Sequence, residues 1–248
     1  MSPTRPDHAA AAEARPESLL TVLIALGANL LIAVAKTFAA ALTGAASMVA
    51  EAAHSWADTG NEVFLYIAAR RSTKPADPRH PYGYGRDAYV WSLFAAFGLF
   101  TIGAGVSIMH GIQELLDPEP ADRFVISYIV LGIAFVLEGT SFLQATRQSK
   151  REATASHRDL LDHVMSTSDP TLRAVFFEDA AALIGLVIAF AGILAHQITG
   201  SATPDAVGSI LVGVLLAVVA ILLIRQNRRF LVGVAIDPEL RAAALQRL

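Results

Sequence analysis

Long apolar blocks, separated by shorter polar segments, run along this 248-residue chain. A helix needs about 20 mainly apolar residues to cross the hydrocarbon core of a bilayer. Six segments reach this length, and each is predicted to form a transmembrane helix: residues 19–42, 45–69, 89–116, 124–145, 172–197 and 207–224. The pattern therefore predicts an all-α fold, a bundle of six transmembrane helices.

The two ends of the chain are more polar and are expected to lie outside this bundle. Residues 1–17 are predicted to be a retained, mobile tail, because the first apolar block exceeds the roughly 7–15 residues of a signal-peptide core. Residues 18–230 are expected to form the transmembrane domain. Residues 231–248 look like the start of a cytoplasmic domain that is truncated or missing, since so short a segment cannot bury a core of its own.

Positive charges in the loops predict how the bundle is oriented. Lys and Arg gather after the second, fourth and sixth blocks, whereas the opposite side offers Arg123 alone. Cytoplasmic loops of membrane proteins carry the excess of Lys and Arg, so both termini are predicted to be cytoplasmic. We expect a multi-pass protein in a membrane of the bacterial inner-membrane type.

Composition narrows the class further. Hydrophobic residues make up 54% of the chain and charged residues 17%, whereas soluble domains carry about a quarter charged residues. The net charge of −3 is too small to indicate a nucleic-acid partner, and the absence of cysteine excludes disulfides and thiolate metal sites. Because HExxH, GxSxG and Walker-type motifs are missing, the sequence predicts neither an enzyme nor an ATP-driven pump.

The second apolar block carries a stripe of polar side chains. They share one face of the predicted helix because they are spaced three and four residues apart: Glu51, His54, Ser55, Asp58 and Glu62. Ionisable groups at bilayer depth are costly and normally face the bundle interior or a water-filled path. His54 and Asp58 lie one turn apart, so an imidazole nitrogen and a carboxylate oxygen can reach one divalent cation.

The fifth block adds two adjacent acids, Glu178 and Asp179. If the second and fifth helices are neighbours, one His, one Asp and one or two further acids make a mixed nitrogen and oxygen site. Such a site suits Zn²⁺, and also Mn²⁺, Fe²⁺ or Co²⁺. The alternative is a buried polar network that joins the two helices. Acids in a second helix favour the metal site, because intramembrane ionisable groups mark transport pathways.

Four further residues are weaker candidates. Glu138, near the centre of the fourth block, is a candidate proton carrier, a helix-pairing group or a cavity-facing acid, and Glu51 is open to the same proton or structural role. Asp77 and His80, in the turn-rich loop before the third block, are candidate ligands of a second metal. An interfacial loop with aromatic anchors explains that segment equally well.

These features together resemble the cation diffusion facilitator family of zinc and related metal transporters. The resemblance covers residue 19 to about residue 237 and rests on the six spans, the acidic start of the fifth block and three segments: residues 52–58 (AAHSWAD), 80–86 (HPYGYGR) and 205–210 (DAVGSI). Residues 168–181 are most similar to the branch that contains the mitochondrial zinc exporter.

The resemblance implies a homodimeric exporter that moves a divalent metal, first of all Zn²⁺, out of the cytoplasm in exchange for protons. Its transport site takes two ligands from the second helix and two from the fifth. His54, Asp58 and Asp179 fill three of these places, whereas Val175, which cannot bind metal, stands at the fourth. Glu178 is the candidate substitute, about 100° around the helix from Asp179.

Other parts of the family pattern are incomplete. Asp77 and His80 match two ligands of a second site that some bacterial members hold, but Tyr84 stands at the third position. The family's cytoplasmic ferredoxin-like domain is not among these residues. The rival hypothesis is therefore a non-transporting membrane scaffold or partner subunit, degenerate at Val175; an intramembrane metalloprotease lacks any base motif to support it.

Overall fold

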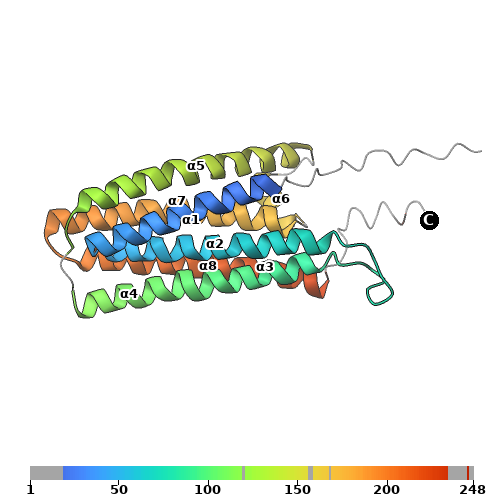
Figure 1. The fold of residues 1–248 in the computed structure, drawn as a ribbon, viewed down its shortest axis with the longest axis horizontal. Helices are drawn as coiled ribbons and strands as arrows, with labels where there is room; N and C mark the ends of the chain where they lie inside the picture. Colours follow the sequence, from blue (N-terminus) through green and yellow to red (C-terminus); the bar gives the residue numbers. More distant parts are fainter. Residues whose placement is uncertain (1–18, 119–120, 156–158, 168, 234–244, 246–248) are drawn as a thin grey trace, which may run out of the picture.

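The computed structural model describes residues 19–118, 121–155, 159–167, 169–233 and 245. Long helices lie side by side along one axis (Figure 1). They are α1 (Leu19–Thr43), α2 (Ala46–Ser72), α3 (Asp87–Gly98) continued through η1 (Leu99–Ala104) into α4 (Gly105–Leu116), α5 (Phe124–Ala155), α7 (Pro170–Thr199) and α8 (Thr203–Val232), with the short α6 (Leu160–Ser166) before α7. The described residues contain no strand, which confirms the predicted all-α fold.

Five of these rods are long and apolar enough to cross a membrane, namely α1, the continuous α3–η1–α4 rod, α5, α7 and α8. The 27-residue α2 is as long, but its polar side chains keep it outside that set. It packs against α1, α3, α7 and α8, so it is the sixth rod of the same bundle. The described part of the chain is thus a multi-pass membrane bundle.

Two helices run well past their predicted ends. α5 continues to Ala155 rather than residue 145, and α8 continues to Val232 rather than residue 224. Hydropathy detects only the part of a helix that is apolar, whereas the backbone hydrogen bonds continue through the charged segments that follow. Both extensions carry basic residues beyond the apolar part of the bundle, Arg and Lys in α5 and Arg in α8.

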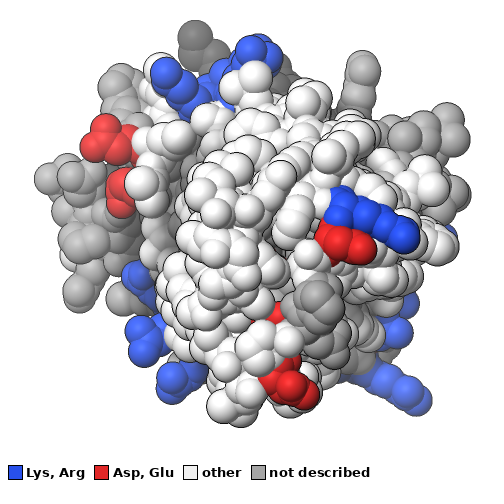
Figure 2. Space-filling model, turned by 90° about the vertical axis from the view of Figure 1, so that its left-hand side faces the viewer, with Lys and Arg blue, Asp and Glu red and all other residues white. Residues whose placement is uncertain are grey.

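The described ends of the chain lie at one end of the bundle. The start of α1, the end of α8 and the loop of residues 73–86 share that end (Figure 1). Figure 2 views the opposite end, where the visible surface is mostly uncharged. This arrangement agrees with an even number of spans, while the side of the membrane remains a prediction. Residues 1–17 and most of 231–248, for which a tail and a partial domain are predicted, lie outside the described residues.

The third rod is interrupted by a π-helical turn. The sequence predicts one long block there, and the structure shows a continuous rod in which η1 joins α3 to α4. A Cβ built on Gly103 of η1 would lie 3.7 Å from the Cβ of Ala57, so this turn packs against the middle of α2. Single π-turns within helices are often found at functional sites. Here the turn packs against Ala57, which precedes Asp58 in α2.

Candidate functional site

The centre of α2 holds a buried imidazole–carboxylate pair. Nε2 of His54 lies 3.4 Å from Oδ2 of Asp58, and the side chain of His54 is completely buried while that of Asp58 is 19% exposed. Among the described residues, neither ring nitrogen of His54 nor Oδ1 of Asp58 has a hydrogen-bond partner. Buried polar atoms are normally paired, so these atoms are available to a ligand that the bundle admits.

The two acids of α7 face different neighbours. Glu178 is buried and accepts a hydrogen bond from the side-chain amide of Asn61 on α2. Asp179 accepts a hydrogen bond of 2.8 Å from the hydroxyl group of Ser141 on α5. Successive helical residues point about 100° apart, so one of two adjacent acids faces α2 more directly than the other. In this structure that residue is Glu178.

The candidate ligands approach one another without closing around an ion. Val175 packs against the apolar core between the helices, as its side chain requires. Asp58 lies within electrostatic range of both Glu178 and Asp179. Within the part of the chain that the structure describes, however, no group of three or more His, Asp and Glu side chains is placed to hold a metal ion. The structure brings His54 and Asp58 together, sets Glu178 on the facing helix and turns Asp179 towards α5.

A buried lysine joins the two remaining acids. Nζ of Lys36 on α1 lies 2.9 Å from Oε2 of Glu51 on α2 and 3.6 Å from Oε1 of Glu138 on α5. We call this group the Lys36 triad. Glu51 and Glu138 are candidates from the sequence, and no role is predicted for Lys36, although a lysine in the middle of an apolar block is itself a signal. The triad ties α1, α2 and α5 together.

A second residue that sequence reasoning did not assign is Asp205, at the start of α8. Its carboxylate accepts hydrogen bonds from the backbone N–H of Ala46, at 2.6 Å, and of Ser47, at 3.2 Å. The first N–H groups of a helix have no partner within that helix, and a carboxylate there satisfies them and complements the helix dipole. Asp205 therefore caps α2 from another helix and fixes the start of the helix that carries His54.

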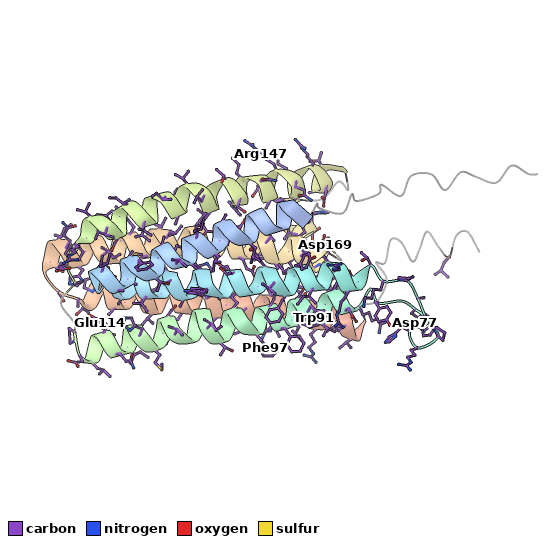
Figure 3. All side chains as sticks on the ribbon, viewed as in Figure 1. Asp77, Trp91, Phe97, Glu114, Arg147 and Asp169 are labelled. Atoms are coloured by element: carbon purple, nitrogen blue, oxygen red, sulfur yellow. The ribbon has the colours of Figure 1, made fainter. Side chains whose placement is uncertain are left out.

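The loop of residues 73–86 is ordered by a different carboxylate. Asp77 lies in this loop, beyond the ends of α2 and α3 (Figure 3). It accepts hydrogen bonds from the Tyr84 hydroxyl at 2.7 Å and from the backbone N–H groups of Arg79 and His80, and Nδ1 of His80 lies 3.3 Å from Oδ1. These donors, first of all Tyr84, lower the pKa of Asp77 to about 2. The candidate pair Asp77 and His80 is thus adjacent, in a loop that its own side chains hold.

The described helices form a membrane bundle with buried ionisable groups. The chain belongs to the cation efflux family: residues 22–232 match the family described as the cation efflux transmembrane domain. The resemblance proposed from the sequence is thereby confirmed. The family and the relatives that match are transporters rather than enzymes, as the missing catalytic motifs predict.

Several characterised relatives cover most of this chain. It is 40% identical to metal tolerance protein C4 of Arabidopsis thaliana over 192 residues, which are 77% of this chain and 42% of the relative. It is 37% identical to the human mitochondrial proton-coupled zinc antiporter SLC30A9 over 218 residues, 88% of this chain and 38% of that protein. A more distant match is the cation-efflux pump FieF of Shewanella oneidensis, 29% identical over 148 residues, 59% of this chain and 46% of the pump.

The lengths of these relatives limit which of their properties can be inferred for this chain. The chain spans about two fifths of the length of the first two, so the activity of the longer proteins is a hypothesis for this one. The zinc antiporters support the branch indicated by residues 168–181. Their names say mitochondrial, and nothing in the comparisons supports the predicted bacterial inner membrane for this chain.

Proposed function

We propose that this chain forms the membrane pathway of a divalent cation exporter that exchanges Zn²⁺ for protons. The observation that carries the proposal is the buried pair of His54 and Asp58, whose ring nitrogens and Oδ1 have no hydrogen-bond partner among the described residues. The pair lies on α2, the helix that binds Glu178 of α7 through Asn61. An imidazole with carboxylates is a ligand set that also suits Mn²⁺, Fe²⁺ and Co²⁺. The relatives named as zinc antiporters favour Zn²⁺ among these metals.

In this proposal the metal is bound between α2 and α7. His54 and Asp58 supply a nitrogen and an oxygen, and Glu178 supplies a further oxygen from the facing helix. A small rotation of α7 would bring in Asp179 as well, because the two acids are adjacent. Ligands must be deprotonated to bind a metal, so loading the ion releases protons and proton entry from the other side releases the ion. Movement of α2 and α7 that opens the site to one side of the membrane and then to the other would exchange the metal ion for protons.

The proposal includes the assembly and orientation that the sequence predicts. The exporter works as a homodimer, with both chain ends in the cytoplasm, in line with the excess of Lys and Arg on that side. Asp77 and His80 stay candidates for a second metal site. The hydrogen bonds to Asp77 order the loop through protein groups, so the loop has no need of a metal to hold its shape.

Metal flux into proteoliposomes with an imposed pH gradient tests this function. We expect Zn²⁺ flux that depends on the gradient, and its loss in both His54→Ala and Asp58→Ala. Asp117→Ala is the control, because Asp117 is exposed at the end of α4. Full transport by Asp58→Ala would overturn the assignment of the site.

The rival is a non-transporting membrane scaffold or partner subunit. Two observations favour it: Val175 stands at a ligand position, and the described residues form no group of three metal-binding side chains. It predicts a folded dimer whose unsubstituted form moves no Zn²⁺, Mn²⁺, Fe²⁺ or Co²⁺. The unsubstituted protein in the same flux assay therefore separates the two functions.

A further inference from the structure

The Lys36 triad is a second buried cluster of ionisable groups, apart from the candidate metal ligands. The side chains of Lys36 and Glu51 are completely buried, and that of Glu138 is 13% exposed. Lys36 donates a hydrogen bond of 2.9 Å to Glu51, whereas its contact with Glu138 is longer, at 3.6 Å. Glu138 is therefore the more loosely held and the less buried of the two acids.

The triad has an unsatisfied oxygen. Oε1 of Glu51 is buried and has no hydrogen-bond partner among the described residues. It lies against Gly185 of α7, where a Cβ would come within 2.8 Å. The triad thus packs tightly against a fourth helix, α7. The partner that balances the charge of Glu51 is Lys36.

The net charge of the Lys36 triad indicates that it can bind a proton. One lysine with two carboxylates carries a net charge of −1 when all three groups are ionised. Charge inside a bilayer is costly unless it is neutralised, and one proton on one carboxylate makes the triad neutral. Glu51 already has the close lysine contact, so Glu138 is the carboxylate that gains most from a proton.

We propose that Glu138 is a second proton-binding group of the transporter, and that one proton bound there loosens the contact of α5 with Lys36. The step is the conversion of one carboxylate and one proton into a carboxylic acid. This inference rests on the proposed exchange of metal for protons and adds a proton site outside the metal ligands.

The position of Glu138 explains how this proton acts on the metal site. Ser141, one turn further along α5, donates to Asp179 of α7, so the same face of α5 holds both the triad and an acid of the candidate site. A proton on Glu138 removes the ion pair that holds this face of α5 to α1. Movement of α5 then frees Asp179 from Ser141.

Other charged groups surround Glu138 and bear on its protonation. Those on the helices around it that are within electrostatic range are Lys36 on α1, Glu51, Asp58 and Glu62 on α2, and Asp179 on α7. On α6, which also packs against α5, the titratable side chains are Asp162 and His163, and His163 lies 3.3 Å from Glu152 near the far end of α5. Four of these five groups are acids, and Lys36 is the only base among them.

Infrared difference spectra of the protein in lipid, acidic against neutral, detect the proton directly. We expect a protonated-carboxyl band that is lost in Glu138→Gln and kept in Glu152→Gln, a control on the exposed part of the same helix. Glu138→Asp should restore the band at a shifted frequency, which decides the matter if the Gln variant does not fold. A band unchanged in Glu138→Gln, or unshifted in Glu138→Asp, would overturn the proposal.

Flux measurements then separate this inference from the proposed function. With Glu138→Gln we expect fewer protons moved per Zn²⁺ while Zn²⁺ binding is retained. An unchanged ratio would overturn a role for Glu138 in the exchange. If the unsubstituted protein moves no metal, the proposed function fails, and the infrared band alone still decides whether Glu138 binds a proton.

Discussion

Glu178 on α7 accepts a hydrogen bond from the side-chain amide of Asn61 on α2. This contact joins the two helices that are proposed to carry the metal. It turns Glu178, rather than Asp179, towards α2. The acid that the family resemblance leaves as a substitute is therefore the one that the structure sets in front of α2.

Removing the charge of Glu178 should weaken metal binding more than removing that of Asp179. We expect Glu178→Gln to lower Zn²⁺ affinity by about tenfold or more, since even groups that only support a metal ligand cost about 10–100-fold. Asp179→Asn should have a smaller effect, because Asp179 is bonded to Ser141. Calorimetric titration of both variants in the same detergent checks the order, and the reverse order would show that Asp179 is the ligand.

Glu178 and Asp179 show which features of the site can be predicted from the sequence and which cannot. Length and hydropathy predict the helices because a bilayer demands long apolar segments, and the spacing of His54 and Asp58 places them on one face of α2. Which of two adjacent acids faces α2 depends on the rotation of α7, which its neighbours decide. Periodicity within one helix carries no information about that rotation.

Contacts between residues far apart in the chain could not be predicted from the sequence for a related reason. Asp205 caps α2 from 159 residues away, and Lys36 joins acids of two other helices. A single sequence shows that such polar residues are out of place in apolar blocks, but it does not say which residues they meet. Partner choice is a property of the packed bundle.

The close approach of Glu51 to α7 makes Gly185 a sensitive position. We expect Gly185→Ala to destabilise the protein by about 1–3 kcal/mol, because the new methyl group would lie 2.8 Å from Oε1 of Glu51. Gly132→Ala on α5 is the matched control, since nothing lies within 4 Å of its Cβ position. Thermal unfolding in one detergent measures both variants, and equal transition temperatures would refute the tight contact.

The cap that Asp205 provides predicts a clear difference between two substitutions. Asp205→Ala should destabilise the protein by about 0.5–2 kcal/mol, the cost of losing a helix N-cap. Asp205→Asn keeps an oxygen that can accept from Ala46, so it should lose less. The same unfolding assay compares them, and an Asn variant as unstable as the Ala variant would show that capping is not what Asp205 contributes.

The loop of residues 73–86 should respond to acid through Asp77. Its pKa is lowered from 3.8 to about 2, first by the hydroxyl group of Tyr84, so the contacts of the carboxylate are fully present above about pH 4 and are lost as the pH falls through 2. Tyr84→Phe should raise this pKa towards 3.8. Carbon-13 NMR of labelled aspartate carboxyl groups follows the titration. The control is Tyr82→Phe, at a fully exposed ring, and an equal shift in both variants would contradict the hydrogen bond's role.

The central claim is that side chains of α2 and α7 share one metal ion, and X-ray absorption at the zinc edge tests it most directly. The chain has no cysteine, so one introduced thiol marks its own position at the metal. We predict a sulfur neighbour at about 2.3 Å from Zn²⁺ in Glu178→Cys and none in Glu152→Cys on the exposed part of α5. A Glu178→Cys spectrum that shows only nitrogen and oxygen neighbours would contradict the claim.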